Sequence, residues 1–250
     1  MRESPRLRVA VFRPDDERLA DAVELLESLG ADPVPDPMLA VEPTGDAPRP
    51  DADYVVLTSK TGVELAAEVG WDPGDATVCA IGSATADALR AAGYEVDVVP
   101  DEYSSVGLVE RLADEVAGAR VEVARSDHGS AVLTDGLEAA GAYVHETILY
   151  RLVRPDGAGE STELAANGAL DAVLFTSSLT VRNFLAAAED RGLRATVLDG
   201  LDEATVGAIG TPTKETAEAA GISVDVVPET ADFETLACAV VEDAAPTHHE

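Results

Sequence analysis

Apolar and polar residues along the chain follow two alternating patterns. Short apolar runs, typical of strands buried in a sheet, are separated by longer segments in which apolar residues recur every three or four positions, as in amphipathic helices. In the segment 16–30, for example, Leu19, Ala22 and Leu26 share one helical face and Gly30 provides a stop. Strands are expected at residues 8–12, 53–57, 77–81, 95–99, 120–124, 172–175, 205–209 and 223–227. Strands that alternate with helices predict parallel α/β sheets.

A long internal repeat organises these elements. The stretch "VCAIGSATADALRAAGYEVDVVP" from Val78 returns as "VGAIGTPTKETAEAAGISVDVVP" from Val206, and more than half of the aligned positions are identical. Upstream, "DYVVLTSKTGV" from Asp53 matches "DAVLFTSSLTV" from Asp171. The second copy holds extra residues around "EDRGLRATVLDGLDEA". The repeat predicts two similar α/β domains.

Two extended segments interrupt the alternation of strands and helices. They are "PVPDPMLAVEP" from Pro33 and "YVHETILYRLVRP" from Tyr143, and we interpret each as a strand that crosses between the domains. The predicted architecture is a duplicated pair of flavodoxin-like, parallel-sheet α/β domains, joined by a two-stranded linker and with a cleft between them. The predicted bounds are 1–35 plus 155–250 for the first domain, 42–147 for the second, and 36–41 and 148–154 for the linker strands.

The charge of the chain is strongly one-sided. Among 250 residues there are 48 acidic and 17 basic side chains, a formal net charge of −31, and the only lysines are Lys60 and Lys214. The acids are dispersed among periodic apolar residues, which make up 46% of the chain, so a disordered acidic tail is not indicated. An acidic surface of this kind indicates a cytoplasm at molar salt, where charge repulsion is screened, and it makes nucleic acid a poor candidate partner.

Other kinds of site and location are disfavoured by what the sequence contains. Cys79 and Cys238 are too far apart for a metal motif, and His128 and His145 are isolated. No Gly-rich dinucleotide fingerprint, phosphate-binding loop or nucleophile elbow is found, so neither a metal nor a cofactor is expected. No apolar run approaches the ~18 residues of a membrane span, and the first residues lack a leader-like apolar stretch. We therefore expect a cytoplasmic monomer without a membrane partner.

Candidate binding residues stand where predicted strands end. In open parallel sheets, ligands bind beyond the carboxyl ends of the strands, near the amide groups of helix N-termini. Glycines there allow close backbone approach, and hydroxyls can bind an anion or can simply cap a helix. Arg13 and Arg125 end equivalent strands and are the leading candidates for binding carboxylates. The predicted binding set is Arg13, Thr58, Ser59, Gly82, Ser83, Thr85, Arg125, Ser126, Ser177, Ser178, Gly210 and Thr213.

Tyr150 is the candidate catalytic residue. It ends the apolar run "ETILY" in the second extended segment, where the other copy has Leu39. A phenol can donate a proton to a leaving hydroxyl at neutral pH. The alternative is an aromatic residue that packs to hold the linker, and the sequence leaves both roles open.

The chain resembles the uroporphyrinogen-III synthase family. The resemblance rests on "VAVFRP", the paired "VVLTSKTGV" and "VLFTSSLTV", "AIGSATADALRAAG", "VARSDHGSAVL", "ETILYRLVRP" and "AIGTPTKETAEAAG". It implies two α/β domains on a two-stranded linker, no cofactor, and closure of the linear tetrapyrrole hydroxymethylbilane into a macrocycle. In that reaction the hydroxymethyl group loses its hydroxyl to give an azafulvene, and ring D is inverted through a spiro intermediate. The family's important tyrosine corresponds to Tyr150.

Two features depart from what the resemblance implies. Lys214 stands where the family has a small residue after the second Gly-x-x-Thr, and the net charge of −31 opposes binding of a substrate with eight carboxylates. Two other functions stay open at this point. One is a non-catalytic module of the same fold that senses a tetrapyrrole or another anion, and the other is a periplasmic-type receptor, which the missing leader disfavours.

Overall fold

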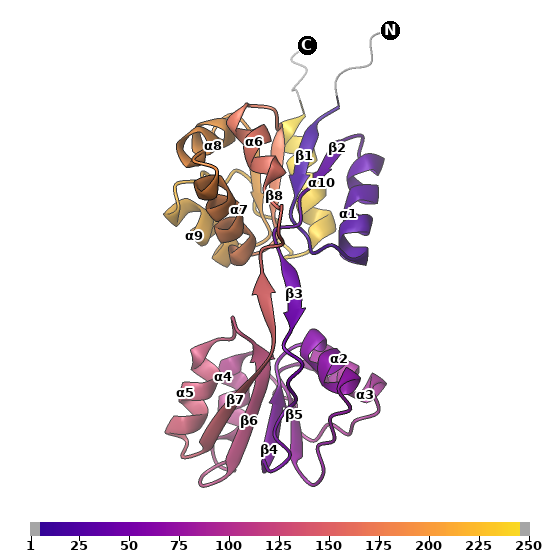
Figure 1. The fold of residues 1–250 in the computed structure, drawn as a ribbon, viewed down its shortest axis with the longest axis vertical. Coiled ribbons are helices and arrows are strands. Elements are labelled where there is room, and N and C mark those ends of the chain that lie inside the picture. Colours follow the sequence, from indigo (N-terminus) through magenta and orange to yellow (C-terminus); the bar gives the residue numbers. More distant parts are fainter. Residues whose placement is uncertain (1–5, 246–250) are drawn as a thin grey trace. The chain divides into compact units, whose positions relative to one another are not determined.

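The chain folds into two compact units. The computed structural model describes residues 6–245; residues 1–5 and 246–250, including the first part of the segment considered above as a leader, lie outside the described residues. Unit 1 combines the residues up to Ala40 with those from Val153 onward, and unit 2 is the continuous segment Val41–Leu152. Figure 1 shows each unit as a sheet with helices on both faces.

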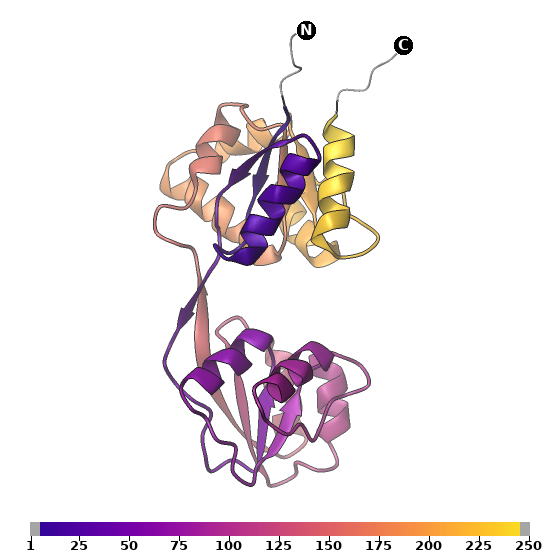
Figure 2. The same cartoon turned by 90° about the vertical axis from the view of Figure 1, so that its right-hand side faces the viewer.

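Unit 1 is a three-layer α/β/α unit. Its strands are β1 (Arg8–Val11), β2 (Asp32–Pro35), β8 (Ala172–Phe175) and β9 (Thr205–Ala208). They lie in the order β2-β1-β8-β9 and pair in parallel. One face is covered by α1 (Glu17–Ser28) and α10 (Phe233–Ala244), which lie side by side in Figure 2. The other face is covered by α6 (Glu160–Ala166), α7 (Ser178–Asp190), α8 (Arg194–Leu201) and α9 (Thr211–Ala219).

Unit 2 has the same layers. Its strands are β3 (Ala40–Pro43), β4 (Tyr54–Leu57), β5 (Thr77–Ala80), β6 (Arg120–Ser126) and β7 (Tyr143–Val153), in the order β3-β7-β6-β4-β5. One face is covered by α2 (Lys60–Glu68) and α3 (Ser83–Ala91), and the other by α4 (Ser105–Leu112) and α5 (Ala131–Ala139). Figure 1 shows these helix pairs on opposite sides of the sheet.

The predicted fold class is confirmed, and the two sheets share one topology. The order β7-β6-β4-β5 in unit 2 corresponds strand for strand to β2-β1-β8-β9 in unit 1. The chain order therefore reverses between β6 and β4, and between β1 and β8, where ligands bind open α/β sheets. The extra residues of the second copy form α8, and α6 has no counterpart in unit 2.

Two of the expected strands are not formed. Residues 95–99 and 223–227 make single bridges, Val98 with Cys79 and Val226 with Gly207. In both segments an aspartate side chain takes a hydrogen bond from the neighbouring strand: Asp97 accepts from Val78 N and Asp225 from Val206 N, each at 2.8 Å. In each case the backbone N–H of the neighbouring strand donates to an aspartate side chain and not to a backbone carbonyl. The backbone pairing between the two segments therefore does not extend further.

The extended segment from Pro33 is also divided differently from the prediction. Instead of one crossing strand it forms β2, which pairs with β1 in the sheet of unit 1, and then β3, which lies beside β7. Its prolines are tolerated because β2 is an edge strand, where a missing amide breaks no central ladder.

A buried carboxylate fixes unit 1 at the point where the chain leaves it and returns. Asp36 is 4% exposed and follows β2. It accepts hydrogen bonds from Gly159 N at 2.8 Å, from Ser161 N at 2.9 Å and from Ser161 Oγ at 2.5 Å. Negative charge at the start of α6 is favourable because a helix N-terminus carries free amides. Asp36 thus joins the end of β2 to the start of α6.

Candidate active site

The carboxyl ends of β4, β6 and β7 surround a hollow of about 370 Å³ in unit 2. It lies at the reversal point of the sheet, where β6 pairs with β4. Five of the predicted site residues line it, namely Thr58, Ser59, Arg125, Ser126 and Tyr150. Residues more than ninety positions apart are therefore brought together, as the predicted topology requires.

Tyr150 and Ser59 form one wall of the hollow. The Tyr150 hydroxyl donates a hydrogen bond to Ser59 Oγ at 2.9 Å, and Tyr150 is 7% exposed. Ser59 Oγ also accepts from Gly62 N at 2.9 Å and so caps α2. The ring of Tyr150 packs in the apolar core with Leu149 and its neighbours. Tyr150 therefore packs in the core of unit 2 and also lines the hollow.

Arg125 is almost fully buried at the end of β6. Its guanidinium pairs with Glu146 on β7 and donates from Nη1 to the Ser130 carbonyl at 2.5 Å. Its Nε–H has no hydrogen-bond partner, although the residue is only 7% exposed. A buried donor without an acceptor is costly, so this N–H is the least satisfied polar group of the Arg125 side chain. Gly129 lies against the guanidinium, and a Cβ there would come within 2.3 Å of Arg125 Cδ.

The loop after β6 is tied to β7 by Asp127. Its carboxylate accepts from Leu152 N at 3.0 Å and contacts His128 Nδ1 at 2.8 Å. Partial burial alone would raise the pKa of Asp127, but the hydrogen bonds from His128 and from Leu152 N outweigh it and lower this pKa. The ionised carboxylate thus fixes the rim of the hollow.

The repeated Gly-x-x-Thr turns lie beside the hollow of unit 2 and at the matching place in unit 1. Gly82 and Gly210 begin α3 and α9, and neither helix has a side-chain cap. Thr85 and Thr213 are each 4% exposed, and neither hydroxyl has a hydrogen-bond partner among residues 6–245. The capping alternative is therefore wrong for both threonines, while Ser83 is exposed at the helix start.

The two glycines of these turns differ in what approaches them. A Cβ on Gly82 would lie 3.0 Å from Tyr103 Cβ, so a side chain already fills that space. At Gly210 the nearest atoms are 4.0 Å away. The expectation of open space for a ligand thus fits Gly210 and not Gly82.

In unit 1 the candidate residues are less concentrated. Ser177 Oγ caps α7 by accepting from Thr180 N at 3.1 Å, and Ser178 Oγ donates to the Pro212 carbonyl at 2.9 Å. Both hydroxyls therefore have structural roles. Arg13 lies over the Phe233 ring at 4.6 Å and forms no ion pair among the described residues. Burial, and then the nearby Arg18, lower the pKa of Arg13.

Several residues at these sites were not predicted. Ser104, Ser105 and Ser130 also line the hollow. Ser104 and Ser130 are the N-caps of α4 and α5, and their position just before an amphipathic segment could have marked them. The ion pair that Glu146 makes with Arg125 joins two strands and has no signal in the local sequence.

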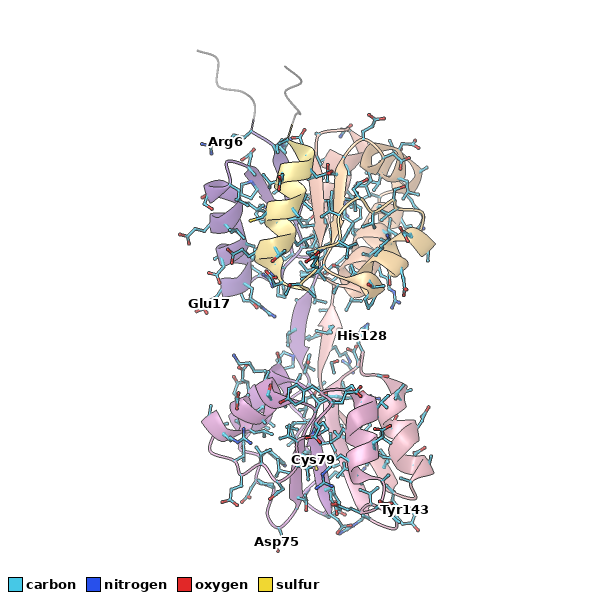
Figure 3. The ribbon with its side chains drawn as sticks, turned by 180° about the vertical axis from the view of Figure 1, so that it is seen from behind. Arg6, Glu17, Asp75, Cys79, His128 and Tyr143 are labelled. Atoms are coloured by element: carbon cyan, nitrogen blue, oxygen red, sulfur yellow. The ribbon has the colours of Figure 1, made fainter. Side chains whose placement is uncertain are left out.

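A second cluster lies at the opposite end of the sheet of unit 2. Glu122 is 1% exposed and binds His145 Nδ1 at 2.7 Å and the Thr147 hydroxyl. Glu122 and His145 border a smaller hollow of about 230 Å³ that Tyr143 also lines. Figure 3 shows Tyr143 at this end and His128 at the other. His145 is thus a partner of a buried carboxylate, far from the loop of His128.

Metal and membrane features were searched over residues 6–245. No group of three or more His, Cys, Asp or Glu in this range is placed to hold a metal ion. None of the helices in the described range is long and apolar enough to cross a membrane.

Comparisons with known proteins identify the family of the chain. The sequence profile described as uroporphyrinogen-III synthase HemD matches residues 20–238. A "putative uroporphyrinogen-III synthase" of Methanothermobacter thermautotrophicus is 35% identical over 237 residues, which is 88% of this chain and 92% of that protein. The chain belongs to the uroporphyrinogen-III synthase family. A uroporphyrinogen-III synthase of Chlorobaculum parvum is 25% identical over 94% of this chain and 98% of its own length.

Solved structures of the family share the fold. A mutant uroporphyrinogen III synthase of Thermus thermophilus matches with a TM-score of 0.66 at 21% identity, over 95% of this chain and 98% of that one. The Helicobacter pylori enzyme matches with a TM-score of 0.64 at 14% identity, over 95% and 99%. At these identities the likeness concerns the fold alone, and it agrees with the topology described above.

Proposed function

We infer that this chain is a uroporphyrinogen-III synthase, a cyclising hydro-lyase. The observation that carries the inference is family membership over nearly the whole chain, from residue 20 to residue 238. The enzyme closes hydroxymethylbilane into a macrocycle with loss of water, and ring D is inverted through an azafulvene and a spiro intermediate.

The reaction requires only a few chemical groups from the protein. Departure of the hydroxyl from the hydroxymethyl group needs one proton donor, and the cation that forms must be held in position and kept from other nucleophiles. The hollow of unit 2 offers hydroxyl groups and a buried phenol, and the Tyr150 hydroxyl lies in its wall. In our proposal Tyr150 supplies the proton for this departure.

We also propose where carboxylates of the substrate bind. The unpartnered Nε–H of Arg125 and the Thr85 hydroxyl are buried donors in unit 2, and a carboxylate accepts from both kinds of donor. In unit 1 the corresponding donors are Arg13, which has no ion pair among residues 6–245, and the Thr213 hydroxyl. Thr58, Ser126 and Ser83 add hydroxyls that can orient the substrate.

The acidic surface belongs to the same proposal. A net charge of −31 repels a substrate with many carboxylates, and at 1 M salt the screening length falls to about 3 Å. We therefore propose that the enzyme works in a salt-rich cytoplasm, where long-range repulsion vanishes and the short contacts of Arg125 and Arg13 remain.

An isomer assay tests the function directly. The purified chain is incubated with freshly made hydroxymethylbilane in 2 M potassium chloride, the products are oxidised, and the uroporphyrin isomers are separated by chromatography. A large excess of type III over the spontaneous type I isomer is expected. Type I alone, from protein shown to be folded by circular dichroism, would refute the synthase and favour a binding module of this fold.

A further inference from the structure

The hydrogen bond between Tyr150 and Ser59 decides which hydroxyl can reach a ligand. Ser59 Oγ accepts twice, from the Tyr150 hydroxyl and from Gly62 N, both at 2.9 Å. A serine hydroxyl has two acceptor sites and one proton. Both acceptor sites are filled, and the Ser59 proton has no acceptor among residues 6–245.

Burial points to the same hydroxyl. Both residues line the hollow, but Tyr150 is 7% exposed and its phenol proton is directed to Ser59, whereas Ser59 is only half-buried. A ligand in the hollow can therefore take the proton of Ser59, while the phenol proton is already engaged. Gly62 keeps the arrangement tight, since a Cβ there would lie 3.1 Å from Ser59 Oγ and 4.0 Å from the Tyr150 ring.

We propose that Ser59 is the group that protonates the leaving hydroxyl and that Tyr150 acts through it. The proposal rests on the proposed synthase function. The hydroxymethyl C–O bond breaks and its electron pair leaves with the oxygen, which takes the Ser59 proton and departs as water. The pyrrole nitrogen supplies an electron pair to the methylene carbon, and Ser59 Oγ takes the phenol proton.

The relay is restored within the same turnover. The Tyr150 phenolate left after water departs is a counter-charge for the azafulvene cation. When ring D later loses the proton from its free α-carbon, that proton returns through Ser59 to the phenolate. Over the cycle, one water is lost and both hydroxyls regain their protons.

Unit 1 contains the same cap without the relay. Ser177 holds the place of Ser59 in the repeat and caps α7 from Thr180 N at 3.1 Å. Its other hydroxyl neighbour is Thr180 Oγ1 at 3.5 Å, and no phenol bonds to it. The matched control is another helix cap of unit 1 that is outside the candidate site residues: Asp232 accepts from Thr235 N at 2.9 Å at the start of α10, so Asp232→Ala removes a helix cap and leaves the proposed chemistry intact.

The test is a double-mutant cycle on kcat for type III formation. The variants are Ser59→Ala, Tyr150→Phe and the double variant, with Asp232→Ala as the control and Ser59→Thr as the conservative rescue. Because the same relay is broken in each case, both single variants are expected to lose about a hundredfold in kcat with little change in KM. The double variant should lose no more than either single variant. Asp232→Ala should keep kcat within about twofold, and Ser59→Thr should regain most of the loss.

Several outcomes would overturn the relay. If Ser59→Ala keeps kcat while Tyr150→Phe loses it, the phenol protonates the substrate directly. If the two losses multiply in the double variant, the hydroxyls act independently. A loss that follows the melting temperature and appears equally in Asp232→Ala would make Ser59 structural. Type I product alone from the wild-type chain would refute the synthase itself, and the relay with it.

Discussion

Glu122 is a buried carboxylate at a position that is apolar in the other unit. In the repeat it corresponds to Ala10, and its strand neighbour His145 corresponds to Val34, because Ala10 pairs with Val34 and Glu122 with His145. Ala10 and Val34 belong to the apolar core on the face that α6 covers, and unit 2 has no such helix. The hydrogen-bonded pair of Glu122 and His145 therefore lies where a covering helix is missing.

This comparison predicts the stability of Glu122 variants. Glu122→Ala should lower the free energy of unfolding by about 2 kcal/mol or more, because His145 and the Thr147 hydroxyl lose their partner. The double variant Glu122→Ala with His145→Val, which copies unit 1, should regain at least half of that loss. Urea unfolding measures both, and a double variant as unstable as the sum of its single variants would contradict the argument.

The two cysteines should differ sharply in reactivity. Cys79, labelled in Figure 3, is fully buried, and burial, helped by the nearby Asp97, raises its thiol pKa to about 12. Cys238 is exposed on α10. Since the thiolate is the reactive form, iodoacetamide at pH 8 should modify one thiol in the native protein and both in urea. Mass spectrometry locates the adduct, and rapid labelling of Cys79 in the native protein would show that unit 2 opens locally.

Among the secondary-structure elements, the sequence predicts those whose position depends on the local pattern of apolar residues. Apolar runs locate β4, β5, β8 and β9, and the repeat predicts the shared topology. Apolar runs also predict strands near Val98 and Val226, which do not form. Their absence could not be predicted from these runs, because it depends on the Asp97 and Asp225 side chains, which accept from backbone amides of the neighbouring strands.

The residues of the candidate site divide in the same way, into those marked by local sequence and those that depend on contacts between distant segments. Position at a strand end is a local property, so Arg125 and Ser59 could be found from the sequence. Their partners could not, because the bonds from Arg125 to Glu146 and from Tyr150 to Ser59 depend on how neighbouring strands are placed. The clamp that Asp36 makes on α6 spans more than a hundred residues and was missed for this reason.

The loop between β6 and α5 should loosen in acid. Because the folded-state pKa of Asp127 is lowered, its bond to Leu152 N contributes stability above the unfolded pKa of about 3.9 and is lost as the pH falls through the lower folded value. Hydrogen exchange should therefore show Leu152 N–H protected at pH 4.5 and losing protection toward pH 2. Asp127→Ala should lack this protection throughout, and equal exchange in both proteins at pH 4.5 would contradict the assignment.

For the whole molecule the dominant quantity is the charge of −31. Most of the ion pairs among residues 6–245 are surface pairs such as Lys60 with Glu64, and exposed pairs are worth little. Repulsion between unpaired acids is long-ranged and is removed by salt.

Stability should therefore rise with ionic strength. Between 0.1 and 2 M potassium chloride we expect the melting temperature to increase by about 5 °C or more, since a gain of about 2 kcal/mol moves the midpoint of a 250-residue chain by several degrees. Differential scanning calorimetry measures this, with sucrose of equal osmolality as the uncharged control. An equal rise in sucrose would assign the effect to excluded solute and not to screening.

The discontinuity of unit 1 affects the order in which a growing chain can fold. A ribosome delivers β1, α1 and β2 first, but β8, which pairs with β1, is made only after all of unit 2. Unit 2 is continuous and can close its sheet as soon as β7 emerges, since domains fold as units during synthesis. The first forty residues are meanwhile without their partner strand, and α1 and its flanks carry the acids Asp15, Asp16, Glu17, Asp21, Glu24 and Glu27, which oppose association of this segment by charge repulsion. Unit 2, encoded by the middle of the gene, can thus fold first, and unit 1, which combines both ends of the chain, can complete its sheet only afterwards.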